Sequence, residues 1–336
     1  MDASVFMDKA QTPTDGDITK VAGRDAMLRV EDLSRKFGEL TAVSGLSFAV
    51  RRGEIFGFLG PNGAGKTTTI KMMCGLLRPH GGAIEIAGRK MRKGDWKGLR
   101  RIGVCPQNIV IWETMTCFEQ LEFMGRMYDL DRRQAGERAS ELLAVFALTE
   151  KRNRLGKTLS GGMQRRLNIA LALVHEPELL FLDEPQAGLD PQSRVLVRDY
   201  IKSLAGKMTI VLTTHDMEEA EKMSDRVCII DKGRLLVLDS VAGIKNRLGQ
   251  GDLFEISIAE DPNQELLPQL SDLGELTGRF TVRDNTVSLV SDAAADVLPL
   301  ILQRIKEKGL HLEDLRIRKT TLEDVFISLT GRGLRE

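Results

Sequence analysis

Short apolar runs alternate along this chain with longer segments in which apolar residues recur at helical spacing. The run at 53–60 ends in glycine, and the runs at 177–185 and 208–216 contain β-branched or aromatic residues, so all three predict buried strands. Residues 66–77 place apolar side chains three and four positions apart, with Gly75 near the end, and predict a helix. Apolar strands that alternate with helices indicate a parallel sheet covered on both faces.

Two further segments of this region have their own patterns. Residues 27–38 and 42–50 are typical of two strands of an antiparallel edge. Residues 108–158 are amphipathic and predict helices. Thr116 followed by Glu119 fits a capping box, which places the start of the first of these helices.

Beyond about residue 245 the pattern changes again, and strand-like segments return. We expect a small α+β domain over 245–336, with Thr320 or Thr321 as the cap of its last helix. The predicted strands lie at about 253–260, 286–292 and 312–319, and the predicted helices lie at about 294–309 and 321–330.

Composition limits the classes of function. The 336 residues suit one large domain and a smaller one. Lys and Arg number 48 and Asp and Glu number 48, so the formal net charge is zero. Proteins that bind nucleic acid electrostatically usually carry a basic excess, so no nucleic-acid partner is expected. No stretch approaches about 18 uncharged apolar residues, which predicts no membrane span.

The beginning of the chain and its cysteines add two expectations. Residues 1–26 mix Asp, Thr, Gly and Pro without periodicity and predict a disordered tail, and they lack the basic start and apolar run of a secretory signal. The cysteines form no CxxC pair, and we expect buried thiols in a reducing cytosol. They are Cys74, Cys105, Cys117 and Cys228.

The loop after the first apolar run, GPNGAGKTT, matches the pattern G-x-x-x-x-G-K-[ST]. Glycines let successive N–H groups bind phosphate oxygens, and the dipole of the following helix faces the same anion. Lys66 adds a positive charge for the β- and γ-phosphates, and the Thr67 hydroxyl is a candidate Mg²⁺ ligand. The preceding strand and following helix argue against a chance match. The candidate nucleotide-binding residues are Gly60, Pro61, Asn62, Gly63, Ala64, Gly65, Lys66, Thr67 and Thr68.

A pair of acidic residues ends the apolar run LLFLDEP. Asp183 and Glu184 would lie at the carboxyl end of a strand, where α/β sheets bind ligands. Asp183 is a candidate Mg²⁺ ligand through water, and Glu184 is a candidate general base for the attacking water. Such a pair alone is usually a solvated turn, but a neighbouring phosphate loop reverses that interpretation.

The motif LSGGMQ at residues 159–164 completes a pattern that resembles the ATP-binding subunits of ABC transporters over about 27–240. The resemblance implies an α/β fold: a P-loop NTPase of the ABC ATPase type over 27–244. Its mixed sheet core would have an antiparallel edge and a helical subdomain at about 108–158, followed by the small C-terminal domain. By the same resemblance, Gln107 belongs to the glutamine loop, Asp190 to the D-loop, His215 is the switch histidine, and Phe37 stacks on adenine.

The resemblance also implies how the molecule works. Ser160, Gly161 and Gly162 open a helix and would contact ATP bound to the opposite subunit, which implies a head-to-tail dimer with two ATP molecules and Mg²⁺ at its interface. Loss of the γ-phosphate, which His215 senses, would loosen this dimer. Gln107 is expected to act in catalysis and at the Mg²⁺ site.

The C-terminal region, ending in TLEDVFISLTGRGLRE, resembles the ATPases of drug- or lipid-exporting systems of the daunorubicin-resistance type. An ordinary regulatory appendage is the alternative. The resemblance implies a separate polytopic transmembrane permease and a location at the cytoplasmic face of the cell membrane. The second ATPase would be another copy of this chain or a paralogue. The permease would contact the segment 108–158, where Trp112 and Met115 are either apolar contacts or core residues.

Functions of other classes fit the sequence less well. A soluble mechanochemical ATPase acting in DNA repair would separate the two halves of the site by long coiled coils, and none is visible between Lys66 and Ser160. A ribosome-associated relative would usually carry two sets of motifs, and this chain has one. A phosphotransferase with the same phosphate loop would have no use for LSGGMQ.

Overall fold

The structure is a computed structural model. The chain divides into two compact units, the first ending at Leu238 and the second beginning at Asp239, ahead of the division expected at 244/245. Residues 1–24 of the predicted tail lie outside the described residues. The described residues are 25–91, 96–246, 251–259, 280–283, 286–291, 294–307, 309 and 311–330.

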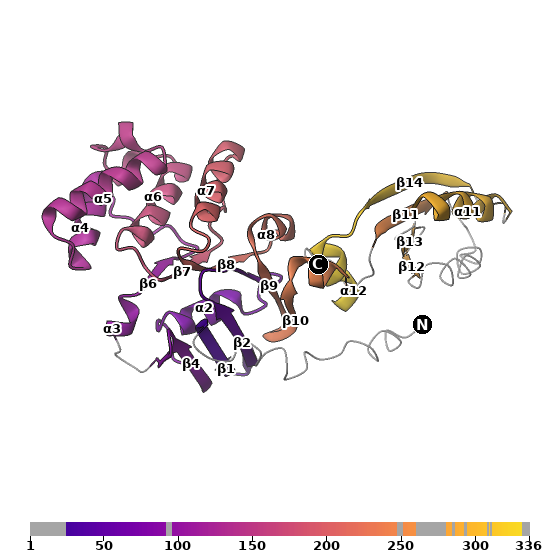
Figure 1. The fold of residues 1–336 in the computed structure, drawn as a ribbon, viewed down its shortest axis with the longest axis horizontal. Helices are drawn as coiled ribbons and strands as arrows, with labels where there is room; N and C mark the ends of the chain where they lie inside the picture. Colours follow the sequence, from indigo (N-terminus) through magenta and orange to yellow (C-terminus); the bar gives the residue numbers. More distant parts are fainter. Residues whose placement is uncertain are drawn as a thin grey trace. The chain divides into compact units, whose positions relative to one another are not determined.

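A four-stranded antiparallel sheet forms one edge of the first unit (Figure 1). The strands β1 (Ala26–Phe37) and β2 (Leu40–Arg51) pair over most of their length, which confirms the predicted antiparallel edge. The strands β4 (Gly81–Ile86) and β5 (Arg89–Lys90) complete it in the order β2-β1-β4-β5, and neither was predicted.

The second sheet of this unit has six strands in the order β10-β9-β3-β8-β7-β6. The pairs β3–β8, β3–β9, β7–β8 and β6–β7 are parallel, which confirms the predicted parallel core. Because β3, β8 and β7 are neighbours, their carboxyl ends meet at one edge. The strands are β3 (Ile55–Leu59), β6 (Ile102–Cys105), β7 (Leu179–Asp183), β8 (Thr209–Thr214), β9 (Arg226–Asp231) and β10 (Arg234–Ser240).

Helices cover this sheet, and several of them begin at side-chain caps. Thr116 and Glu119 form the predicted capping box at the start of α4. Asp131 forms a second one at the start of α5. The helices are α2 (Lys66–Met73), α3 (Trp96–Leu99), α4 (Cys117–Met127), α5 (Arg132–Val145), α6 (Gly161–Leu173), α7 (Pro191–Ser203) and α8 (Met217–Met223), and the short 3₁₀ turns η2 (Thr149–Lys151) and η3 (Gly156–Thr158) precede α6.

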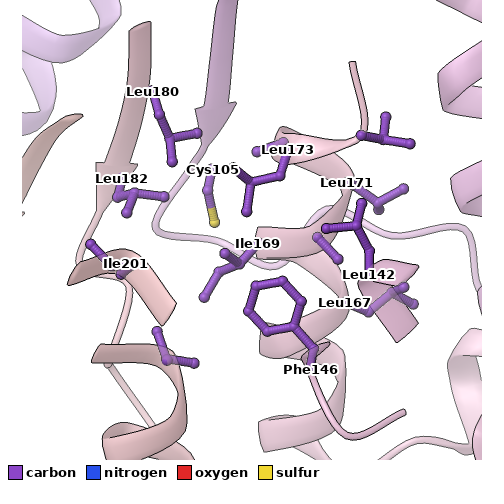
Figure 2. Packing of buried hydrophobic residues seen from close by; sticks show 14 of the residues in the cluster. Cys105, Leu142, Phe146, Leu167, Ile169, Leu171, Leu173, Leu180, Leu182 and Ile201 are labelled. Carbon is purple, nitrogen blue, oxygen red and sulfur yellow. The ribbon is translucent and has the colours of Figure 1, made fainter. Parts of the chain in front are cut away.

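Helix α6 packs between the parallel sheet and the helices α4 and α5, so it links both parts of the unit. Figure 2 shows its apolar side chains between Leu180 and Leu182 of β7 and Leu142 and Phe146 at the end of α5. These residues belong to one cluster whose members are mostly below 5% exposed. The four cysteines are free and buried, as expected.

The second unit contains an antiparallel sheet in the order β12-β13-β11-β14 and a helix packed on it. Thr321 caps the last helix, since its hydroxyl accepts from the Asp324 amide at 3.3 Å. The predicted strands and helices of this region are confirmed, and β12 and α9 are additional. The elements are α9 (Val241–Asn246), β11 (Asp252–Ile258), β12 (Phe280–Arg283), β13 (Thr286–Ser291), α11 (Ala294–Glu307), β14 (Leu312–Lys319) and α12 (Leu322–Thr330).

In the part of the chain that the structure describes, every helix is too short or too polar to cross a lipid bilayer.

Candidate nucleotide site

The loop Gly60–Gly65 joins β3 to α2, and its backbone requires glycine at both ends. Gly60 and Gly65 have φ angles of 153° and 103°, which side chains rarely allow. A Cβ atom would lie 2.3 Å from the Ile230 carbonyl oxygen at the first glycine and 2.5 Å from that of Ala42 at the second. Gly65 gives α2 no side-chain cap. The first N–H groups of α2 therefore lack both intrahelical and side-chain partners, as an anion site requires.

Lys66, the first residue of α2, is 6% exposed. Its ammonium donates to the main-chain oxygens of Gly60, at 2.6 Å, and Pro61, at 3.1 Å. Burial lowers the pKa of Lys66, while the nearby carboxylates of Glu184 and Asp183 raise it. The phosphate loop and the acidic pair therefore belong to one electrostatic site, as the sequence predicts.

Asp183 ends β7 and is 3% exposed. Its carboxylate accepts a hydrogen bond from the hydroxyl of Thr213, its partner in the neighbouring strand β8. The Thr213 hydroxyl oxygen in turn accepts from the Glu184 amide at 3.1 Å. The carboxyl ends of β7 and β8 thus fix the acidic pair together.

Glu184 has a φ of 52°, in the left-handed region that non-glycine residues rarely adopt. Its carboxylate is almost buried, and Nδ1 of His215 lies 2.9 Å from each of its two oxygens. The His215 side chain follows β8 and remains 59% exposed. An imidazole N–H that donates to this carboxylate fixes its orientation.

The donors available for Mg²⁺ match what this ion takes in nucleotide sites. No cluster of three or more His, Cys, Asp or Glu side chains that could form a metal centre occurs among the residues the structure describes. Mg²⁺ beside a nucleotide needs only one or two protein oxygens, because phosphates and water complete its shell. The Asp183 carboxylate and the Thr67 hydroxyl fit that requirement. Gln107 lies on an exposed loop after β6.

The predicted signature and D-loop residues form a second cluster. Ser160 caps α6, where its hydroxyl accepts from the Met163 amide at 3.3 Å. A Cβ on Gly162 would lie 3.7 Å from Oδ2 of Asp190. Asp190 caps α7 by accepting from the amide and hydroxyl of Ser193, and these bonds lower the pKa of Asp190. The exposed Gly161 and the two caps thus lie side by side.

Phe37, the predicted adenine platform, ends β1 and is 45% exposed. The guanidinium carbon of Arg35 lies over its ring, 4.8 Å from the centroid. Arg35 also donates to the Arg78 carbonyl oxygen at 2.7 Å. The arginine supports the ring from one side, and the exposed part of the ring remains available for stacking.

Sequence reasoning missed Arg165. This residue of α6 is 2% exposed, and its guanidinium donates to the main-chain oxygens of both Gln107 and Glu184. The only signal in the sequence is its place five residues after Ser160, within a pair of arginines. Its partners are carbonyl groups, which no motif reveals.

Known proteins resemble this chain both within the first unit and along nearly its whole length. A family model described as ABC transporter matches residues 43–187. The linearmycin resistance ATP-binding protein LnrL of Bacillus subtilis is 38% identical over 92% of this chain and 100% of its own length. The daunorubicin resistance ATP-binding protein DrrA2 of Streptomyces coeruleorubidus is 37% identical over 90% of this chain and 95% of its own.

Two more proteins extend the comparison. The Nod factor export ATP-binding protein I of Ralstonia nicotianae is 37% identical over 94% of this chain and 97% of its own. A solved ATP-binding cassette, a dimer in a post-hydrolysis state bound to ADP and Pi, aligns with a TM-score of 0.59 and 25% identity. The aligned part covers 64% of this chain and 98% of the cassette chain. The similarity to the curated relatives therefore includes both units.

Proposed function

This chain belongs to the ABC transporter family of ATP-binding, ATP-hydrolysing subunits, and we propose that it powers an exporter whose membrane-spanning part is a separate polytopic permease. The observation that carries the proposal is the convergence of Lys66, Asp183 and the Glu184–His215 pair at one edge of the parallel sheet. Likeness to resistance and export proteins along nearly the whole chain supports the direction of transport. The cargo is a drug, lipid, polysaccharide or ion chosen by the permease.

The residues divide the work of hydrolysis. The loop Gly60–Gly65, the start of α2 and Lys66 bind the phosphates, and Phe37 stacks on adenine. Asp183 and Thr67 would hold Mg²⁺, which supplies charge neutralisation at the phosphates. Glu184, oriented by His215, accepts a proton from the attacking water. His215 is exposed enough to meet the γ-phosphate.

A head-to-tail dimer completes the site. The cluster of Ser160, Gly161 and Asp190 presents an exposed helix N-terminus with a short cap and no side chain at the glycine. Such an end binds an anion, here the phosphates of ATP on the opposite subunit. The dimeric cassette with ADP and Pi supports this arrangement. The second subunit is another copy of this chain or a paralogue.

A hollow on the helical subdomain, lined by both polar and apolar side chains, is the proposed permease contact, at the cytoplasmic face of the membrane. Its volume is about 350 Å³. Beside the hollow, the rings of Trp112 and Phe123 pack edge to face, with their centroids 5.6 Å apart. Both rings are exposed. Exposed aromatic residues beside a hollow are typical of a protein contact. The lining residues are Thr114, Met115, Glu119, Glu122, Phe123 and Arg126.

A pull-down from native membranes tests the partner. Tagged Glu184→Gln protein, held closed by ATP and Mg²⁺, should retain a polytopic membrane protein. Phe123→Ser in the same background should lose most of that partner, because it removes the ring at the hollow. Leu76→Ser is the matched control, since Leu76 is 70% exposed and absent from the lining of the hollow.

Two outcomes would oppose the proposal. Recovery of only ribosomes, DNA or soluble proteins would favour a mechanochemical ATPase. Equal loss with Leu76→Ser and Phe123→Ser would show that the hollow is not the contact.

A further inference from the structure

The guanidinium of Arg165 is buried among main-chain oxygens from two separate segments. Its five N–H groups meet five carbonyl acceptors, so each donor has a partner. Three of the acceptors are consecutive residues at the end of β7 and in the turn that follows it, and two belong to the loop after β6. The donor–acceptor distances are 2.7 Å to Pro106, 3.0 Å to Gln107, 2.7 Å to Asp183, 2.5 Å to Glu184 and 3.2 Å to Pro185.

This convergence explains why a charge is buried here. In a regular strand successive carbonyl groups point in opposite directions, but those of Asp183, Glu184 and Pro185 turn toward one group. Glu184 has the unfavourable φ of 52° at the centre of this turn. A planar donor holds the turn, and through it the backbone from which the Glu184 carboxylate projects. An apolar residue would remove all five of these bonds, and the acceptors that are buried would lose a donor that water cannot replace.

Asn168 lies one helical turn beyond Arg165 and binds residues on both sides of the same loop. Its side-chain oxygen accepts from the Val110 amide at 3.2 Å, and its amide nitrogen lies 3.3 Å from Sγ of Cys105. Asn168 is 3% exposed. Residues three apart lie on one face of a helix, so this face of α6 holds the Gln107 loop before and after the glutamine.

The N-terminus of the same helix carries the signature residues. Helix α6 starts at the Ser160 cap, and its apolar side chains belong to the single buried cluster of Figure 2. Ser160 and Arg165 are about 1.4 helical turns apart, so a shift of the cap moves the guanidinium with it. Within one subunit, α6 therefore connects the surface that meets the partner's nucleotide to the subunit's own Gln107 and Glu184.

We propose that Arg165 is a positioning residue that keeps the Glu184 turn and the Gln107 loop aligned with the signature end of α6. The inference rests on the proposed roles of Glu184 and Gln107. All five donors of Arg165 bind carbonyl groups outside the phosphate loop, and Lys66 donates to Gly60, so we expect nucleotide affinity not to depend on Arg165. Loss of the Arg165 guanidinium should lower turnover while ATP binding stays unchanged.

Arg165→Lys and Arg165→Gln provide the test, with Arg166→Lys as the matched control. A lysine ammonium has three donors and a glutamine amide has two, so neither can satisfy five acceptors. Arg166 is the next residue on α6, but its guanidinium donates to the Phe146 carbonyl oxygen at 2.7 Å, away from the acidic pair. Phosphate release, the Kd of a fluorescent ATP analogue and the thermal midpoint are measured for each protein.

We expect both Arg165 variants to lose about 10- to 100-fold in kcat, since a small misplacement of a catalytic group has effects of that order. Their ATP Kd should stay within a factor of two or so of wild type, and Arg166→Lys should keep its turnover. Wild-type turnover in the Arg165 variants would overturn the inference. Equal falls in affinity and kcat, or misfolding of both variants when Arg166→Lys folds, would also overturn it. Hydrolysis that survives Glu184→Gln would instead contradict the proposed role of Glu184.

Discussion

Single buried charges give the nucleotide site its shape, and their partners are mostly main-chain oxygens. Lys66 donates to the carbonyls of Gly60 and Pro61, and Arg165 donates to five carbonyls of the acidic turn and the Gln107 loop. Each interaction satisfies a group that would be costly to bury alone. Bonds within the protein therefore fix both the loop and the turn.

Lys66→Ala tests the contribution of the buried ammonium. It removes a charge-assisted hydrogen bond to phosphate, worth about 1.5–3 kcal/mol, so ATP Kd should rise about 10- to 100-fold. Lys71→Ala is the control, because Lys71 is exposed in the last turn of the same helix. Titration with a fluorescent ATP analogue measures both. Unchanged affinity in Lys66→Ala would contradict the phosphate-binding assignment.

Whether a residue could be predicted from sequence depends on the kind of partner it has. Lys66, Asp183, Glu184 and His215 occupy fixed places in motifs, because the chemistry of phosphate and water demands those side chains. Arg165 could not be predicted, since its partners are backbone groups that only the fold brings together.

Elements show the same contrast between local and distant causes. The start of α4 was predictable because the capping box of Thr116 and Glu119 depends on residues three apart. Strands β6 and β9 were not predicted, since short strands are stabilised by neighbours far away in sequence. The predicted helices in both units are present because their apolar spacing repeats over several turns.

Thr116→Ala measures how much this local signal contributes. The alanine removes the hydroxyl that accepts from the Glu119 amide at 3.2 Å, so the free energy of unfolding should fall by about 1 kcal/mol. Thr114→Ala, an exposed position outside the helix, should change it by less than about 0.5 kcal/mol. Urea unfolding followed by circular dichroism compares the two. An equal effect at both positions would show that the cap contributes no special stability.

The whole molecule combines a hydrolytic unit with a second α+β unit, and the curated relatives match it across both. We expect ATP to bind where β3, β7 and β8 end, and the signature cluster is exposed on the same unit. A phosphate site and an exposed signature on one chain require a second subunit for a complete site. In the proposed mechanism, hydrolysis then opens the dimer, and the permease follows that motion.

Glu184→Gln with ATP and Mg²⁺ tests this central claim most directly, by the rate of phosphate release. The amide keeps the size of the side chain but cannot accept the proton from water. We expect turnover to fall by about 10²- to 10⁴-fold, with ATP affinity unchanged and a long-lived dimer. Phosphate release at the wild-type rate would show that Glu184 is not the base and would contradict the mechanism.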